Sequence, residues 1–282
     1  FFRMRVKTLI SRAAMCVVVA KYFDDIGWVG AKQRDRNYVP DISFEREKVG
    51  DVEILMYKDN TTGYREGLNS KGIAILSASL KVADDEKEIE KKTTKHSGDG
   101  DRINRALKES SLSKAVKACI DGKLTGNTLI FNKDRCFLLE ACNQPCKEGN
   151  EEGKYEYKVM EIPKDKTIAR TNHGVKLPWA GYQKTGDKSE KESRKSSEAR
   201  LMIARKVAKA ARTPNSILDL LCVKYSNNPQ MNTLRTTTDK KKMRTTAQIL
   251  LIPSEETMYF RPVASDVNYN FHKLDEIGRA HV

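Results

Sequence analysis

The order of short apolar segments most constrains the fold of this chain. Residues 16–23 and 27–33 flank the turn sequence DDIG, and residues 127–131 and 136–141 flank NKD, so each pair predicts a hairpin. Further strands are predicted over 52–58, 72–80 and 154–162, with a last hairpin over 246–263, and helices over 111–123, 201–212 and 216–225. Strands and helices thus come in alternating groups, which favours an α+β layered sheet protein over a doubly wound one.

Local patterns refine these elements. The continuous apolar run 72–80 predicts a buried central strand. The first predicted helix places Leu112, Ala115, Val116 and Cys119 on one face and ends at Gly122. Residues 84–102 are rich in charge and turn residues and predict a solvated excursion. Residues 181–200 predict a mobile loop that leads into a helix capped by Ser196 or Ser197.

Composition excludes several function classes. The net charge of +14 raises the question of nucleic acid, but lysine and arginine are interspersed with acidic residues, so nucleic-acid binding is not expected. The six cysteines form no paired CxxC sets, and we expect neither a metal site nor a disulfide framework, which fits a cytoplasmic setting. The sequence contains no transmembrane run, glycine-rich phosphate loop, HExxH or GxSxG, so we expect no membrane association and no cofactor.

The two ends are set apart from the predicted domain. Residues 1–15 are interpreted as a leader, a propeptide or upstream translation, followed by an initiator methionine. Residues 16–275 are predicted to form a single domain. Residues 276–282 back-translate without strain to the start of a widely used sequencing adapter, and are interpreted as an assembly artefact.

The pair Met15-Cys16 at the start of the first strand has two readings. Free cysteine is among the most often buried residue types, and Cys16 heads the strand-like run VVVA, so it can be a core residue. Alternatively, removal of Met15 would leave Cys16 as an N-terminal residue that carries a thiol and an α-amine on one carbon. Such a residue could provide both the nucleophile and the base for attack on an amide.

Four separated stretches resemble one family, the choloylglycine hydrolase and penicillin V acylase group of N-terminal nucleophile hydrolases. They are MC with the following hairpin and KQRDRNY, then EGLNSKGIAILSAS, ARTNHG and SSEARLMIAR. Their order and rough spacing agree with the family over about Met15 to Asp266. The resemblance implies a four-layer αββα sandwich with the nucleophile, Cys16, at the start of an inner strand.

The resemblance also implies roles for other residues. Arg34 matches the arginine beside the nucleophile, Asn172 the oxyanion-hole asparagine, and Arg200 a late buried arginine. The family's aspartate falls three positions after its arginine, where this chain has Asn37, so either Asp35 or Asn37 takes that role.

Substrate class is less defined. Ser79 occupies a position that separates bile-salt-cleaving from penicillin-cleaving members and fits neither. His173, beside Asn172, is expected to pack or hydrogen-bond locally, because an N-terminal amine leaves it no necessary role.

The predicted function is a cysteine N-terminal nucleophile amidohydrolase. It would cleave linear, non-peptide C–N bonds of a small-molecule amide through an acyl-enzyme, with bile-salt, penicillin V or N-acyl amide substrates. The alternatives are an acyltransferase of the same fold and a catalytically degenerate basic binding protein, which Asn37 and Ser79 favour. A glutamine amidotransferase domain is disfavoured because Val17 stands where glycine is expected after the cysteine. Similarity to the family also suggests a homo-oligomer.

Overall fold

The computed structural model describes residues 14–80, 98–143, 154–237, 242–263 and 272–273. The interpretations of residues 1–13 and 276–282, and most of the predicted excursion over 84–102, lie outside these residues. Within the described part of the chain, no helix combines the length and the apolar character needed to cross a membrane.

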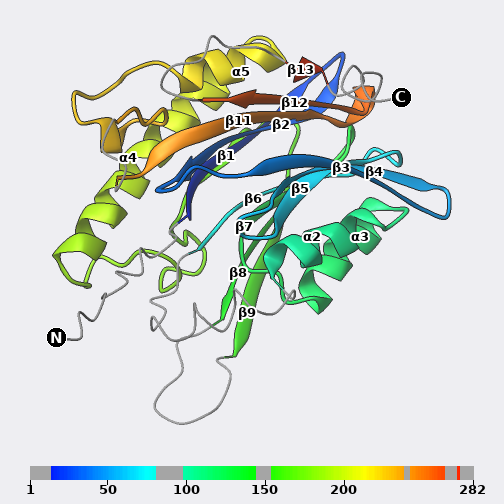
Figure 1. Cartoon of the computed structure of the whole chain (residues 1–282), viewed down its shortest axis with the longest axis horizontal. Helices are drawn as coiled ribbons and strands as arrows, with labels where there is room; N and C mark the ends of the chain where they lie inside the picture. Colours follow the sequence, from blue (N-terminus) through cyan, green and yellow to red (C-terminus); the bar gives the residue numbers. More distant parts are fainter. Residues whose placement is uncertain (1–13, 81–97, 144–153, 238–241, 264–271, 274–282) are drawn as a thin grey trace, which may run out of the picture.

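Two antiparallel sheets pack face to face between two layers of helices (Figure 1). In spatial order, the six-stranded sheet contains β10 (Ile168–Arg170), β1 (Ala14–Phe23), β2 (Gly27–Arg36), β11 (Arg244–Ile252), β12 (Thr257–Pro262) and β13 (His272–Lys273). The seven-stranded sheet contains β3 (Ile42–Val49), β4 (Val52–Asp59), β5 (Tyr64–Asn69), β6 (Ala74–Ala78), β7 (Gly126–Phe131), β8 (Cys136–Asn143) and β9 (Tyr155–Ile162).

Helices cover the outer face of each sheet. Helices α4 (Lys188–Ala210) and α5 (Pro214–Leu221) pack on the six-stranded sheet, and α2 (Asp99–Leu107) and α3 (Leu112–Asp121) pack on the seven-stranded sheet (Figure 1). Short 3₁₀ turns occur at Pro229–Met231 and Pro253–Glu255. The predicted α+β fold with αββα layers is therefore confirmed.

Alternation along β1 divides the core. Cys16 and Val18 point between the two sheets, whereas Val17 and Val19 point toward α4 and α5. The sheets approach each other closely at Gly30 of β2, where a Cβ atom would lie 2.3 Å from Phe131 Cζ. Both faces of β1 are therefore buried, and the two sheets lie close together beside it.

Most predicted elements are confirmed, and two predictions are wrong. The run at 72–80 contains β6, which is buried and central in its sheet. Helix α4 begins at Lys188, where the Asp187 side chain caps it, so Ser196 and Ser197 lie inside the helix and are buried. The lysines, glutamates and arginine before Ser196 favour a helix over the predicted loop.

The predicted solvated excursion is wrong at its C-terminal end. Residues 99–102 begin α2, whose Ile103, Ala106 and Leu107 are buried at helical spacing. Strands β3, β5 and β10 were not predicted, because their segments lack a continuous apolar run or are very short. Helix α3 agrees with the sequence pattern, with Leu112, Ala115 and Cys119 buried.

Candidate active site

Cys16 lies near the start of β1, with its thiol on the inner face of the six-stranded sheet. Its side chain is buried, and its Sγ accepts a hydrogen bond from Arg36 Nη1 at 3.5 Å. Burial alone would raise the pKa of the thiol, but the positive charges of Lys32 and Arg36 outweigh burial, and the net pKa lies below its ordinary value. The site therefore favours the thiolate, which is the nucleophilic form.

The positive charges come from alternate residues of β2. Lys32, Arg34 and Arg36 share the inner face, because side chains two apart along a strand point the same way. Arg34 is paired with Cys16 in the β-ladder, but its guanidinium forms a buried ion pair with Asp59. Arg36, rather than the predicted Arg34, is the arginine that contacts the thiol.

Lys32 forms a buried ion pair with a carboxylate from the opposite sheet. Its Nζ lies 2.7 Å from Glu66 Oε2 and also donates to the carbonyl of Ser77 at 2.7 Å. Tyr57 and Tyr64 both donate their hydroxyls to the same carboxylate. The EGLN stretch of the sequence thus supplies Glu66, which anchors the lysine whose charge acts on the thiol.

Asn172 holds the main chain of the cysteine. It lies just after β10, and its Oδ1 accepts the backbone N–H of Cys16 at 2.8 Å. Its Nδ2 donates to the carbonyl of Ser79 at 2.8 Å, and its own backbone N–H donates to Ser197 Oγ at 3.1 Å. Three motifs that are far apart in the sequence, those of Cys16, Asn172 and Ser197, therefore meet at this point.

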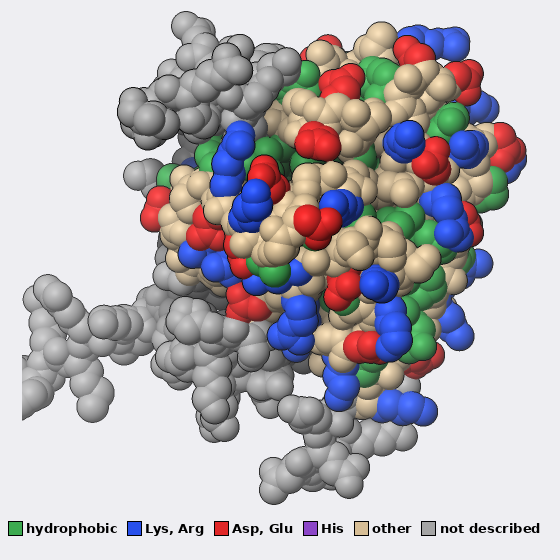
Figure 2. Space-filling model, turned by 90° about the vertical axis from the view of Figure 1, so that its right-hand side faces the viewer, with side chains coloured by type: hydrophobic (Ala, Val, Ile, Leu, Met, Phe, Trp, Pro, Cys, Tyr) green, Lys and Arg blue, Asp and Glu red, His purple; other side chains and the backbone are tan. Residues whose placement is uncertain are grey.

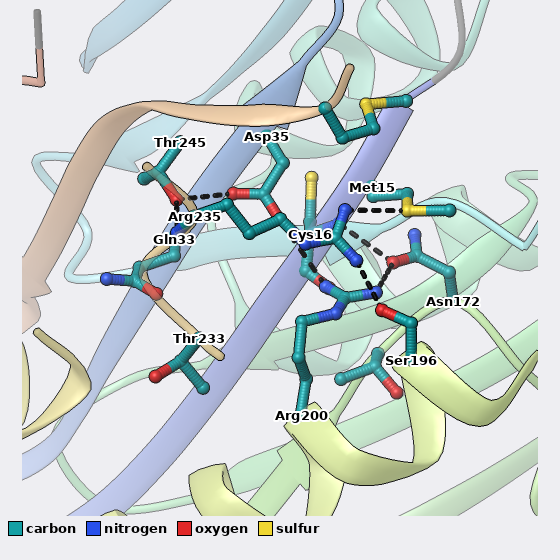
Figure 3. Close-up of polar contacts among 12 residues, drawn as sticks. Met15, Cys16, Gln33, Asp35, Asn172, Ser196, Arg200, Thr233, Arg235 and Thr245 are labelled. Carbon is teal, nitrogen blue, oxygen red and sulfur yellow. Dashed lines mark hydrogen bonds and ion pairs between the residues drawn. The ribbon is translucent and has the colours of Figure 1, made fainter. Parts of the chain in front are cut away.

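Arg200 on α4 joins these groups from the outer face. Its Nη1 donates to the Cys16 carbonyl and its Nη2 to Asn172 Oδ1, both at 3.2 Å (Figure 3). Burial and the nearby positive charge of Arg235 lower the pKa of the guanidinium to about 9, although Asp35 opposes the shift. Arg200 thus remains a cation at neutral pH and fixes both polar partners of the cysteine main chain.

Asp35 faces α4, on the opposite side of β2 from the thiol. Its Oδ2 lies 3.5 Å from Arg200 Nη1 and 3.6 Å from Arg235 Nε, and Thr245 Oγ1 donates to its Oδ1 at 2.8 Å (Figure 3). Burial raises the pKa of this carboxyl in spite of the two arginines. Asn37 lies one residue beyond the end of β2 and is half-buried. Asp35 therefore connects to the Cys16 main chain through Arg200.

His173 and Met15 are two further buried residues beside the site. His173 Nδ1 lies 2.8 Å from Ser197 Oγ and 3.2 Å from Thr171 Oγ1, so the expected local hydrogen bonding is present. Its burial lowers its pKa to about 4, and the imidazole is neutral near pH 7. Met15 is buried, and its Sδ accepts a hydrogen bond from Arg235 Nη1 at 2.8 Å (Figure 3).

Sequence reasoning missed three residues of the site. Lys32 lies in the predicted strand 27–33, and extending its period of two beyond the strand's predicted end would have placed Arg34 and Arg36 on the same face. Arg235 had no such signal, because it follows the 3₁₀ turn in a segment without a regular pattern.

Comparisons with known proteins give structural matches only. No family model and no curated protein sequence matches the chain. Among solved structures, the chain is similar to penicillin V acylase from Agrobacterium tumefaciens, with 10% identity, a TM-score of 0.49, and coverage of 93% of this chain and 87% of that one. It is also similar to a mutant of the conjugated bile acid hydrolase from Clostridium perfringens, with 12% identity, a TM-score of 0.47 and 93% coverage of each chain.

Proposed function

We propose that this chain is a cysteine N-terminal nucleophile amidohydrolase that cleaves linear, non-peptide C–N amide bonds. The observation that carries the proposal is the arrangement at Cys16. Its thiol, with a lowered pKa, faces Arg36 on one side, while its backbone nitrogen lies 2.8 Å from Asn172 Oδ1. An ordinary buried cysteine needs neither a cation at its sulfur nor a buried amide at its nitrogen.

The chemistry requires Cys16 to be the first residue of the active chain. Cleavage of the bond after Met15 would convert the Cys16 N–H into an α-amine, whose ordinary pKa is near 7.7 to 8.0. Asn172 Oδ1 would accept a hydrogen bond from that amine as it does from the amide N–H. Removal of Met15 would also vacate its buried position beside Arg235.

Each step then has a group to perform it. The α-amine accepts the proton of the thiol, and the resulting thiolate attacks the substrate carbonyl carbon and forms a C–S bond. The ammonium group then returns this proton to the leaving amine as the C–N bond breaks. Water then hydrolyses the thioester and restores the thiol. An amide nitrogen carries two N–H donors, and Asn172 Nδ2 uses one on Ser79, so the other would stabilise the negative oxygen of the tetrahedral intermediate.

In this proposal, Asp35 rather than Asn37 takes the role of the family's aspartate. Asp35 would hold Arg200, which in turn holds Asn172 and the Cys16 carbonyl. The family's aspartate falls three positions after its arginine, and in this chain Lys32 stands three positions before Asp35, so a lysine would replace the family's arginine. Arg34 would then have a structural role, through its ion pair with Asp59.

The test compares turnover by chains with defined N-termini. One protein begins at Cys16, released from a cleavable tag, and a second retains an uncleavable residue before it. The assay measures release of amine from conjugated bile acids, penicillin V and a series of N-acyl amides. We expect turnover only from the first protein, and loss of turnover in Cys16→Ala but not in Cys222→Ala, a matched change at a partly exposed cysteine.

Equal turnover by the blocked chain or by Cys16→Ala would refute the proposal. The same assay with an added acceptor amine distinguishes hydrolysis from acyl transfer, because transfer gives a new amide and hydrolysis gives the free acid.

A further inference from the structure

The outer edge of β9 has features of a pairing surface. In the described part of the chain, β9 ends the seven-stranded sheet and is paired with β8 on one side only. An exposed strand edge offers unpaired backbone N–H and C=O groups to another strand. Tyr157 and Val159 are 44% and 36% exposed on this strand, which is a large exposure for apolar side chains.

The charges of β9 select one self-pairing register. Two identical antiparallel strands can pair so that the same face of each points outward. A two-fold axis then passes between the two copies of one residue, which lie directly opposite each other. Within β9, an axis at any charged residue would place two like charges directly opposite each other. An axis at any other position except Tyr157 would place no two charged residues of the strand opposite each other. An axis at Tyr157 instead places Glu156 opposite Lys158 of the second copy, twice by symmetry, and Tyr155 opposite Val159.

We propose that β9 pairs with β9 of a second copy of this chain, centred on Tyr157. The pairing would join two seven-stranded sheets into one continuous sheet and cover the exposed parts of Tyr157 and Val159. This inference does not depend on the proposed catalytic function, since β9 contributes no residue to the Cys16 site.

A charge-swap series tests the proposed register by sedimentation velocity over a range of protein concentrations. Lys158→Glu and Glu156→Lys each create two like-charge pairs, and we expect each to weaken dimerisation by about tenfold or more. The double variant restores opposite charges and should recover the wild-type dimer. Lys166→Glu makes the same change in charge at an exposed lysine outside the strand, and should have no effect.

Cysteine cross-linking tests the centre of symmetry. Tyr157→Cys places two thiols opposite each other, at a Cα separation that a disulfide can span. Val159→Cys is the matched control, because its two copies would lie about 14 Å apart along the antiparallel strands. We expect the Tyr157→Cys disulfide alone, identified by the mass of the linked peptide.

Two outcomes would overturn the proposal. A wild-type chain that remains monomeric at all concentrations would show that the β9 edge does not pair. A dimer that is unaffected by the charge changes, or that cross-links equally at both positions, would place the interface elsewhere.

Discussion

Replacement of Arg36 by glutamine should raise the pKa of the Cys16 thiol. Arg36 Nη1 lies 3.5 Å from Cys16 Sγ, and in the described part of the chain no carboxylate lies within ion-pair distance of this guanidinium. A full charge at 3.5 Å in a medium of effective dielectric constant near 20 contributes about 5 kcal/mol, or roughly 3.5 pKa units. Because the guanidinium charge is delocalised, we expect an upward shift of about 1 to 3 units.

Thiolate absorbance in the ultraviolet measures this shift directly. The titration of Cys16→Ser is subtracted from that of the wild-type chain, which leaves the signal of Cys16. Burial raises the pKa of Cys119 to about 12 and also raises that of Cys136, so these thiols contribute little near neutral pH. Arg36→Lys keeps a positive charge and should shift the pKa less than Arg36→Gln does. Arg135→Gln, at an exposed position, serves as the control.

The result that would refute this reasoning is an unchanged titration in Arg36→Gln. The lowered pKa of Cys16 would then depend on Lys32 alone, which the structure places in an ion pair with Glu66. A lower activity of Arg36→Gln at neutral pH, recovered at higher pH, would support the electrostatic role independently of absorbance.

Three further predictions concern stability, measured by urea unfolding. His173 has a pKa of about 4 in the folded chain, against about 6.5 in the unfolded chain. Its contribution to the free energy of unfolding should therefore be fully present above pH 6.5 and fall by about 3 kcal/mol as the pH drops to 4. His173→Gln should flatten this pH dependence, and an unchanged slope would contradict the prediction. Glu140→Gln should cost about 1–3 kcal/mol, because Glu140 Oε1 accepts three backbone N–H groups of residues 175–177; a loss below experimental error would count against it. Gly30→Ala should cost about 1–3 kcal/mol through contact with Phe131, and a neutral effect would show that the sheets can separate there.

The sequence pattern predicted an α+β layered fold because both its sheets and its helices bury periodic apolar faces, whereas the four αββα layers were implied by the family resemblance. The β1–β2 hairpin and β6 were predictable for that reason. Strand β3 was not, because its position at the edge of the sheet allows charged residues at half of its sites. Helix α4 began earlier than predicted, since a cap at Asp187 is hard to recognise within a polar, low-complexity segment.

The structure brings Cys16, Asn172 and Arg200 together, as the resemblance implies, but the ion pairs around them could not be predicted from the sequence. The alternation of side chains along a strand shows that Lys32, Arg34 and Arg36 share a face, but it cannot show which of them form ion pairs. That depends on Asp59 and Glu66, which reach them from the opposite sheet. Likewise, the contact of Asp35 with Arg200 depends on how α4 packs on the six-stranded sheet.

The most direct test of the central claim is the mass of the trapped acyl-enzyme. A chain that begins at Cys16 is mixed with a substrate that it turns over, quenched in acid within the first turnover, and digested for peptide mapping. We predict one acyl group on the Cys16 sulfur, as a thioester sensitive to hydroxylamine, together with an unmodified α-amine. Acylation of another residue, or turnover with no adduct at Cys16 under conditions that trap a thioester, would contradict the account.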